Sequence, residues 1–240
     1  EIEKIQGIID GTYALSQDIK KVAISVREWP HFKTCSKEDG MARYKAAIAA
    51  LVTKLVRERG MDITFLSTCR GLPNYRYDDS QVAQEIYDGL PTGIQKNVTV
   101  NSEHRTPEEV ISLIKEMDFV VATRMHMMIM ALCAGVPVLP ISYEFKTTEL
   151  SKDLKIDRLL SDIEEVTPED LCKKADLLLG DFQEWATLTM QGVLEQYRSA
   201  MRAVPLIQKA LGLPQIEQNP GLSAEKETSE APEARSSRAA

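Results

Sequence analysis

The stretch DFVVATRMHMMIMALCAGVPVLPIS, residues 118–142, contains two short apolar runs separated by a segment of helical length. The first run, 118–122, is rich in β-branched residues, and the second, 136–142, directly follows Gly135. Such runs are typical of strands buried on both faces of a sheet, and the segment between them predicts a helix that the glycine ends. The stretch therefore predicts a strand–helix–strand unit of a parallel sheet.

The same alternation extends toward the N-terminus. A capping box at Thr106–Glu109, with proline at the first helical position, opens the helix that precedes residue 118. Further strands are predicted at 21–27, 62–66 and 97–100, and further helices at 39–59 and 78–90. About five repeats of strand and helix predict an α/β fold, a doubly wound and mostly parallel Rossmann-like sheet with helices on both faces.

After residue 146 the pattern becomes helical. Thr167–Asp170 predicts another helix start, and 182–211 predicts one long helix or two consecutive ones. From residue 219 the chain is rich in Ser, Glu, Ala, Pro and Arg without apolar periodicity, so residues 219–240 are predicted to be a disordered tail.

The composition narrows the class of protein. The 240 residues are 43% hydrophobic and 27% charged, with a formal net charge of −7. An acidic chain is a poor general binder of nucleic acid, and no apolar run reaches the ~20 residues of a membrane-spanning helix. The N-terminal residues lack the apolar core of a signal peptide, and the four cysteines lack CxxC spacing. A cytoplasmic protein with free thiols is therefore expected.

Basic side chains recur wherever a predicted strand ends, although the chain is acidic overall. In strand order they are Arg27, Arg70, His104 with Arg105, Arg124 with His126, and Lys146. Ligands of open parallel sheets bind beyond the carboxyl ends of the strands, so these side chains are expected along one rim. His104 and Arg105 fit an ordinary polar loop and are left out of the candidate site.

The rim predicts a site for a small ligand with more than one negative charge. Arginine binds carboxylate and phosphate in a bidentate manner, and the free N–H groups at a helix start near Met125 also favour anions. His126 lies beside them as a proton donor or acceptor. Asp78 and Asp79 are interpreted as the N-cap of the next helix rather than as catalytic acids.

Three short motifs in this region resemble those of the polysaccharide pyruvyl transferases. They are Arg124-Met125-His126 after a strand, Gly135-Val136-Pro137 before the next, and Tyr143-Glu144-Phe145-Lys146 after it. The arginine that ends the first strand, Arg27, also matches, and the resemblance covers roughly residues 20 to 155.

The resemblance implies the C-terminal lobe of a two-lobed, glycosyltransferase-B-like enzyme that uses phosphoenolpyruvate to form a pyruvate ketal on a saccharide. It implies phosphoenolpyruvate as co-substrate, with no metal or other cofactor, and a saccharide or lipid-linked saccharide as acceptor. His126 and Arg124 are the expected catalytic residues. The residues expected to bind phosphoenolpyruvate are Arg27, Arg124, Met125, His126 and Lys146, with Ser142, Tyr143 and Arg70 as additional candidates.

On this interpretation the chain divides into four parts. They are a linker from a missing N-terminal lobe (1–20), a Rossmann-like donor-binding domain (21–160), C-terminal helices packed on it (161–215) and the tail (219–240). Because the chain starts at Glu1 without methionine, it is expected to be a fragment. The cleft of such a fold lies between two lobes, so this chain alone is expected to bind the donor weakly and to turn over nothing. The family also implies loose association with the inner face of the membrane.

One residue departs from the family pattern, and two other functions compete. Met127 stands where a smaller side chain is expected, which predicts a narrower pocket. A glycosyltransferase that uses a nucleotide sugar is one alternative, with Glu144 or Glu149 as the ribose-binding carboxylate. The other alternative is a non-catalytic lobe that only binds a partner.

Overall fold

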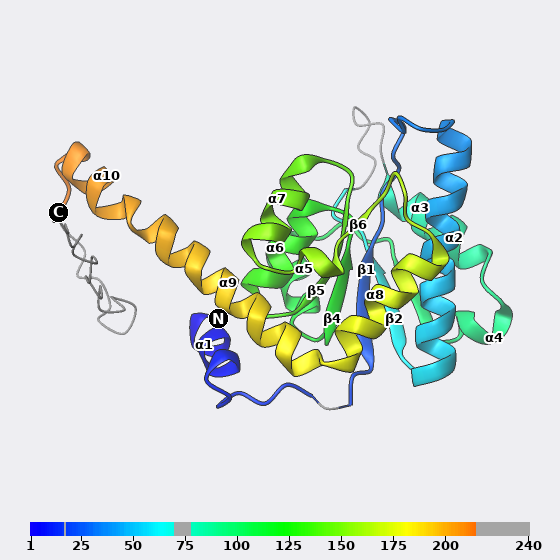
Figure 1. Cartoon of the computed structure of the whole chain (residues 1–240), viewed down its shortest axis with the longest axis horizontal. Coiled ribbons are helices and arrows are strands. Elements are labelled where there is room, and N and C mark those ends of the chain that lie inside the picture. Colours follow the sequence, from blue (N-terminus) through cyan, green and yellow to red (C-terminus); the bar gives the residue numbers. More distant parts are fainter. Residues whose placement is uncertain (17, 70–77, 215–240) are drawn as a thin grey trace, which may run out of the picture. The chain divides into compact units, whose positions relative to one another are not determined.

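The structure, a computed structural model, describes residues 1–16, 18–69 and 78–214. Its sheet has six strands, and every neighbouring pair is parallel (Figure 1). The strands are β1 (Lys21–Ser25), β2 (Asp62–Leu66), β3 (Val98–Asn101), β4 (Phe119–Ala122), β5 (Val138–Ser142) and β6 (Ser161–Asp162). All residues of β4 and β5 are buried, as a sheet covered on both faces requires. The Rossmann-like fold class is confirmed.

The strand order, β3-β2-β1-β4-β5-β6, places a switch point between β1 and β4. From β1 the chain builds outward through β2 to β3, then returns to the other side of β1 and builds outward again. The connections that leave β1 and β4 therefore run in opposite directions, and at such a point doubly wound sheets have a crevice between the connections. In doubly wound sheets, ligands bind in this crevice, beyond the carboxyl ends of the strands.

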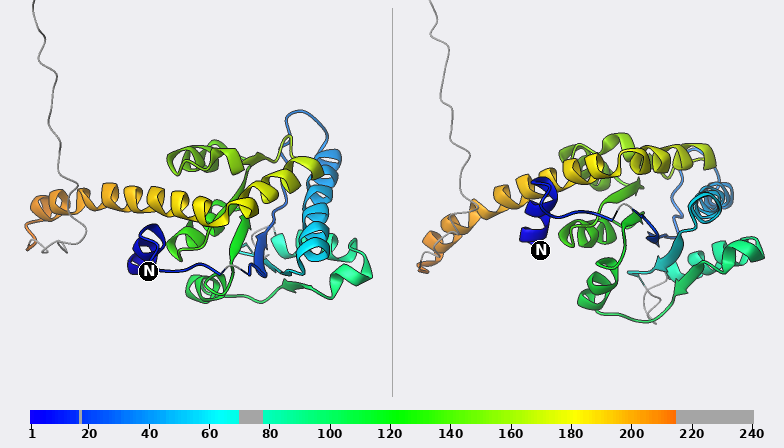
Figure 2. Two further views of the ribbon diagram at one scale, coloured as in Figure 1. Left: turned by 60° about the horizontal axis from the view of Figure 1, so that its bottom comes forward. Right: turned by 90° about the horizontal axis from the view of Figure 1, so that it is seen from below.

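Helices cover both faces of the sheet (Figure 2). The described helices are α1 (Ile2–Ile9), α2 (Lys37–Arg59), α3 (Asp79–Asp88), α4 (Thr92–Gln95), α5 (Pro107–Ile114), α6 (Met125–Cys133), α7 (Phe145–Asp153), the 3-10 helix η1 (Asp157–Leu159), α8 (Pro168–Gly180), α9 (Phe182–Met201) and α10 (Ala203–Leu211). Helix α2 packs against α3 and α8, whereas α6 packs against α5. Right-handed crossovers that run in opposite directions from the switch point put α2 and α6 on opposite faces.

The helix boundaries follow the local signals. The Ser36 side chain accepts from the N–H of Asp39 at the start of α2, and Gly60 ends that helix at φ 61°. At α5, Thr106 and Glu109 form both hydrogen bonds of the predicted capping box. These elements could be predicted because their caps involve residues that are adjacent in the sequence.

Four short elements were not predicted: α1, α4, η1 and β6. Helix α1 lies within the segment expected to be a linker, and its Ile5 and Ile8 are buried. The Lys4 ammonium donates to the carbonyl of Ala134 at 2.9 Å, at the C-terminal end of α6. Helix α4 and strand β6 have only four and two residues, too few to carry a periodic pattern.

The chain divides into two compact units, residues 1–195 and residues 196–240. In the first unit, α8 packs against α2, and Trp185 and Met190 of α9 are buried. In the second, Gln208 of α10 donates from its amide to the carbonyl of Pro214 at 2.7 Å. The segment 182–211 forms two consecutive helices, because α9 ends at Met201 and α10 begins at Ala203. The predicted tail, 219–240, lies outside the described residues.

No helix in the described ranges combines the length and the apolar character needed to cross a lipid bilayer.

A matched pair of glycine substitutions tests the packing of α9. A Cβ atom at Gly192 would lie 2.9 Å from the Leu154 Cα, which is backbone and cannot give way. Overpacking costs about 1–3 kcal/mol, partly offset by the better helix propensity of alanine, so Gly192→Ala is expected to destabilise the protein by about 1–2 kcal/mol. At Gly180 a Cβ would meet nothing within 4 Å, and Gly180→Ala is expected to stabilise by about 0.4–1 kcal/mol. Urea unfolding of both variants measures the difference. Equal midpoints would contradict close packing at Gly192.

Candidate active site

Two arginines lie at the switch point, one on each side of the crevice. Arg27 follows β1 by two residues and Arg124 follows β4 by two residues. Ser25 ties the two strand ends together: its carbonyl accepts from the N–H of Thr123 at 3.2 Å, and its hydroxyl accepts from the N–H of Arg124 at 3.3 Å. Parallel pairing of β1 with β4 thus brings together residues that are far apart in the sequence.

The Arg124 side chain is paired with a buried carboxylate. Its Nε and Nη2 donate to the two oxygens of Asp79 at 2.8 and 2.7 Å. The side chain of Asp79 is 0% exposed and that of Arg124 is 12% exposed. Burial raises the pKa of the Asp79 carboxyl, and the hydrogen bonds and charge of Arg124 oppose that rise. Burial also acts to lower the pKa of Arg124, but the pairing outweighs it and holds the pKa above its usual value.

Both aspartates at this helix start were predicted to be N-caps, and only Asp78 is one. The Asp78 carboxylate accepts from the N–H of Ser80 at 3.0 Å, as an N-cap does. Asp79 instead turns inward to Arg124. One carboxylate is enough to cap a helix. The second aspartate, directly after the cap and at the carboxyl edge of β2, was therefore the signal in the sequence that Asp79 has another partner.

The Arg27 guanidinium is packed between aromatic rings. Its Cζ lies 3.8 Å from the centroid of the Tyr143 ring and 4.9 Å from that of Trp29. The Nε donates to the carbonyl of Glu28 at 3.1 Å, and the residue is 8% exposed. Burial raises the pKa of the Tyr143 hydroxyl, while the charge of Arg27 acts to lower it. Arg27 is therefore a charged group in a largely apolar setting, where it attracts anions more strongly than in water.

A second buried contact lies next to Arg124, at the neighbouring residue Thr123. The Tyr44 hydroxyl of α2 lies 2.8 Å from the Thr123 hydroxyl, and both residues are fully buried. Burial raises the pKa of Tyr44 well above its usual value, so the phenol stays protonated. This contact joins α2 to the loop that carries Arg124 and holds that loop against the β1 side of the crevice.

Two helix starts lie at the same edge of the sheet, because α6 follows β4 and α7 follows β5. Neither has a side chain that caps its first N–H groups: the N-cap residues are Arg124 and Glu144. The candidate residues here are reachable from solvent, since His126 and Lys146 are exposed and Met125 is half-buried.

The remaining candidates from the sequence differ in their surroundings. Ser142 is buried, and its hydroxyl donates to the carbonyl of Ser161 at 3.4 Å, between β5 and β6. Arg70 lies outside the described residues. Met127 is fully buried among the core side chains, so the expectation that it narrows the pocket is wrong. Helical periodicity explains this, because Met127 is one residue beyond the exposed His126 and faces inward.

The two carboxylates considered as ribose-binding groups for a nucleotide sugar, Glu144 and Glu149, both interact with neighbouring residues. Glu149 is exposed and pairs with Lys152 at 2.8 Å. Glu144 is half-buried and interacts with the neighbouring Tyr143 hydroxyl.

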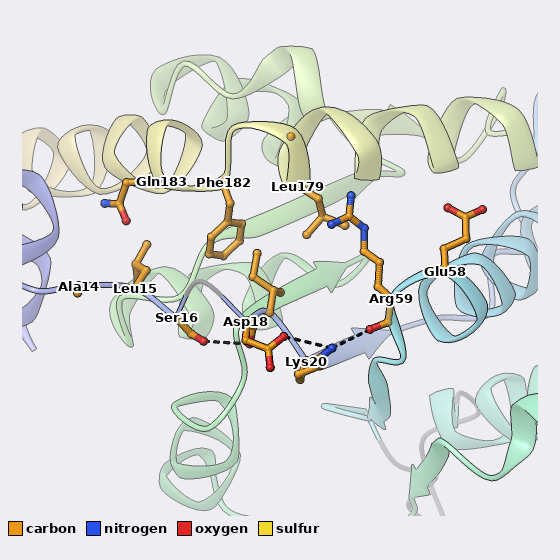
Figure 3. A pocket seen from close by; sticks show the side chains of 12 residues that line it. Ala14, Leu15, Ser16, Asp18, Lys20, Glu58, Arg59, Leu179, Phe182 and Gln183 are labelled. Atoms are coloured by element: carbon orange, nitrogen blue, oxygen red, sulfur yellow. Dashed lines mark hydrogen bonds and ion pairs between the residues drawn. The ribbon is translucent and has the colours of Figure 1, made fainter.

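A hollow of about 630 Å³ lies at the opposite, amino edge of the sheet (Figure 3). Two of its lining residues form an ion pair with each other: the Lys20 ammonium lies 3.1 Å from the Asp18 carboxylate and also donates to the carbonyl of Arg59 at 3.0 Å. The candidate residues for chemistry gather at the carboxyl edge instead. We therefore locate the candidate site by its arginines and not by this hollow.

The Rossmann-like fold resembles that of the C-terminal lobe of glycosyltransferases of the B type. The chain is similar to a structure described as trehalose-6-phosphate from E. coli bound with UDP-2-fluoro glucose, at 11% identity and a TM-score of 0.52, covering 81% of this chain and 46% of that one. A trehalose-6-phosphate synthase structure gives 13% identity, a TM-score of 0.51 and the same coverage. At such identities the likeness concerns the fold alone.

The sequence model described as polysaccharide pyruvyl transferase matches residues 2–144, and the chain belongs to this family. The matched range includes Arg27, the Arg124–His126 motif and helix α1. The chain is also 27% identical over 167 residues to the amylovoran biosynthesis protein AmsJ of Erwinia amylovora, covering 69% of this chain and 39% of that protein. The chain thus spans well under half the length of this relative.

Proposed function

We propose that the switch-point crevice binds phosphoenolpyruvate and that the protein transfers its pyruvyl group to a saccharide in polysaccharide biosynthesis. One observation carries the proposal: in a chain of this family, Arg27 and Arg124 stand at the carboxyl ends of adjacent strands, on the two sides of the crevice. A ligand with a carboxylate and a phosphate matches two arginines better than a singly charged ligand does.

The two arginines hold the two anionic groups of phosphoenolpyruvate. Free N–H groups near Met125, at the start of α6, add hydrogen bonds and the positive end of the helix dipole. Lys146, exposed in the first turn of α7, neutralises the charge of the departing phosphate. Tyr143 packs on Arg27 and restricts its motion.

The reaction proceeds by proton transfer and two attacks on one carbon. A proton adds to the methylene carbon of phosphoenolpyruvate and converts it into a methyl group. A saccharide hydroxyl attacks the neighbouring carbon, and the proton lost from that hydroxyl balances the one added. The bond from this carbon to the phosphate oxygen then breaks. The second hydroxyl closes the ketal, and its proton leaves with the phosphate. His126, exposed at the edge of the site, acts as general acid or base.

The saccharide approaches from the open side of the crevice. The related AmsJ is much longer than this chain, so we assign part of the acceptor contacts to a second lobe that faces this one. A cytoplasmic enzyme that meets a lipid-linked acceptor at the inner face of the membrane would suit this arrangement.

Binding of phosphoenolpyruvate tests the proposal. We expect calorimetry to detect phosphoenolpyruvate binding that is tighter than binding of inorganic phosphate or UDP. Tighter binding of UDP would favour a nucleotide-sugar glycosyltransferase. The absence of phosphoenolpyruvate binding by the protein would contradict the proposal.

The Asp79 pair decides which Arg124 variant is informative. Arg124→Ala would leave a buried carboxylate without a partner, and breaking such a pair costs about 3–5 kcal/mol. Arg124→Lys keeps a charge beside Asp79 but cannot form two bidentate contacts. We therefore expect Arg124→Lys to remain folded and to lose most of the affinity for phosphoenolpyruvate.

A further inference from the structure

The buried Asp79 carboxylate uses only one side of the Arg124 guanidinium. A guanidinium has two edges that can bind a carboxylate or phosphate in a bidentate manner, and they share Nη2. Asp79 occupies the edge formed by Nε and Nη2. Within the described part of the chain, Nη1 has no hydrogen-bond partner. Among these described residues, none therefore occupies the second edge, formed by Nη1 and Nη2, which can bind an anion.

Asp79 is itself held in place by its surroundings. It is fully buried in the first turn of α3, directly after the N-cap Asp78. Its N–H donates to the carbonyl of Cys69 at 3.1 Å, just beyond β2. The carboxylate therefore offers a fixed partner to Arg124, whose flexible side chain would otherwise have to be ordered when a ligand binds.

We propose that Asp79 is a positioning residue, which fixes Arg124 so that its second edge receives an anionic group of the substrate. The inference rests on the proposed function for the identity of the substrate, whose anionic group at this edge is a carboxylate or a phosphate. The net positive charge of the site then comes from Arg27 and Lys146, because the Arg124–Asp79 pair is neutral as a whole.

Asp79 can affect anion binding in two opposite ways, by charge repulsion and by positioning Arg124. The two predict opposite changes in affinity when its charge is removed. Its negative charge repels an anion, so a purely electrostatic role predicts that Asp79→Asn binds phosphoenolpyruvate more tightly. Positioning predicts weaker binding, because an asparagine has only one acceptor oxygen and its amide nitrogen cannot accept from Arg124. We expect Asp79→Asn to weaken binding about three- to tenfold, the cost of ordering one long side chain.

Calorimetry on Asp79→Asn is the test, with Glu85→Gln as matched control. Glu85 lies on the same helix and pairs with Lys45 at 2.9 Å, in an exposed position. The control is expected to bind as the unmodified protein does. Thermal melting verifies that both variants are folded. Equal or tighter binding by Asp79→Asn would overturn the proposal.

A double-mutant cycle separates positioning from a general structural role. If Asp79 acts through Arg124, then Asp79→Asn is expected to have little further effect on binding in the Arg124→Lys background. An equal loss in both backgrounds would overturn positioning.

A third measurement does not depend on any ligand. In ¹⁵N NMR, the Nε–H of Arg124 is expected to be protected from exchange in the unmodified protein and in Glu85→Gln, but not in Asp79→Asn. A protected Nε–H with no binding of phosphoenolpyruvate would count against the proposed function while leaving the Asp79 contact intact. An unprotected Nε–H in the unmodified protein would overturn the positioning role itself.

Discussion

Replacing His126 with glutamine is expected to lower kcat about 10²- to 10⁴-fold, the usual contribution of a general acid or base. Glutamine keeps hydrogen-bonding capacity but cannot exchange a proton near neutral pH. His126 is exposed at the start of α6, so the fold should not be affected. The rate of phosphate release from phosphoenolpyruvate, measured with the protein and a saccharide acceptor, gives kcat. Calorimetry should find the affinity for phosphoenolpyruvate nearly unchanged.

His104→Gln is the matched control for this change. His104 is also exposed and follows a strand of the same sheet, β3, but it was assigned to an ordinary polar loop. Its variant should retain full activity. If His126→Gln were as active as the control, the assignment of His126 to proton transfer would be abandoned. If it lost binding and activity in the same proportion, His126 would be a binding residue instead.

Replacing Arg27 with alanine is expected to weaken phosphoenolpyruvate binding roughly 10- to 150-fold, as the loss of a charged hydrogen bond of about 1.5–3 kcal/mol implies. The guanidinium is held against the rings of Tyr143 and Trp29 at 3.8 and 4.9 Å. Arg27→Lys keeps the charge but loses the planar group that packs on these rings. Its affinity should therefore fall between that of Arg27→Ala and that of the unmodified protein.

A second arginine that packs on an aromatic ring provides the control. Arg158 lies with its Cζ 5.6 Å from the centroid of the Trp185 ring, and it belongs to η1 rather than to a strand end at the switch point. Arg158→Ala should alter stability slightly and leave binding unchanged. Equal effects of the two alanine variants on affinity would argue that Arg27 acts through general charge and not as part of the crevice.

Most of the fold could be predicted because the relevant signals are local. The apolar run at 118–122 needed only its own residues to indicate a buried strand, and Gly60 and Thr106 marked helix ends through contacts with close neighbours. Helix α1 was not predicted because it is stabilised by contacts with residues far away in the sequence. Its Lys4 contact with Ala134 spans 130 positions in the sequence, and no local pattern reports such a contact.

The candidate site could be predicted in part. Placing Arg27 and Arg124 at one edge required only the rule that parallel strands end together, and the observed pairing of β1 with β4 agrees with it. The roles of Arg27, Arg124, Met125, His126 and Lys146 stay predictions. The role of Ser142 also stays a prediction. This last residue of β5 is buried, and its hydroxyl donates to the carbonyl of Ser161, because side chains along a strand alternate between the two faces of a sheet.

The sequence by itself determined the alternation of strands and helices, the edge at which basic residues gather and the family to which the chain belongs. These depend on residue type and on short spacings. Only the tertiary structure decided that Asp79 pairs with Arg124, from 45 positions away, and that Tyr143 packs on Arg27. The physical reason is that the carboxylate of an aspartate after a helix cap can accept hydrogen bonds either from nearby backbone N–H groups or from a side chain far away in the sequence, and the local sequence is the same in both cases. Which of the two occurs is settled by burial, since a carboxylate removed from water requires a charged, hydrogen-bonded partner.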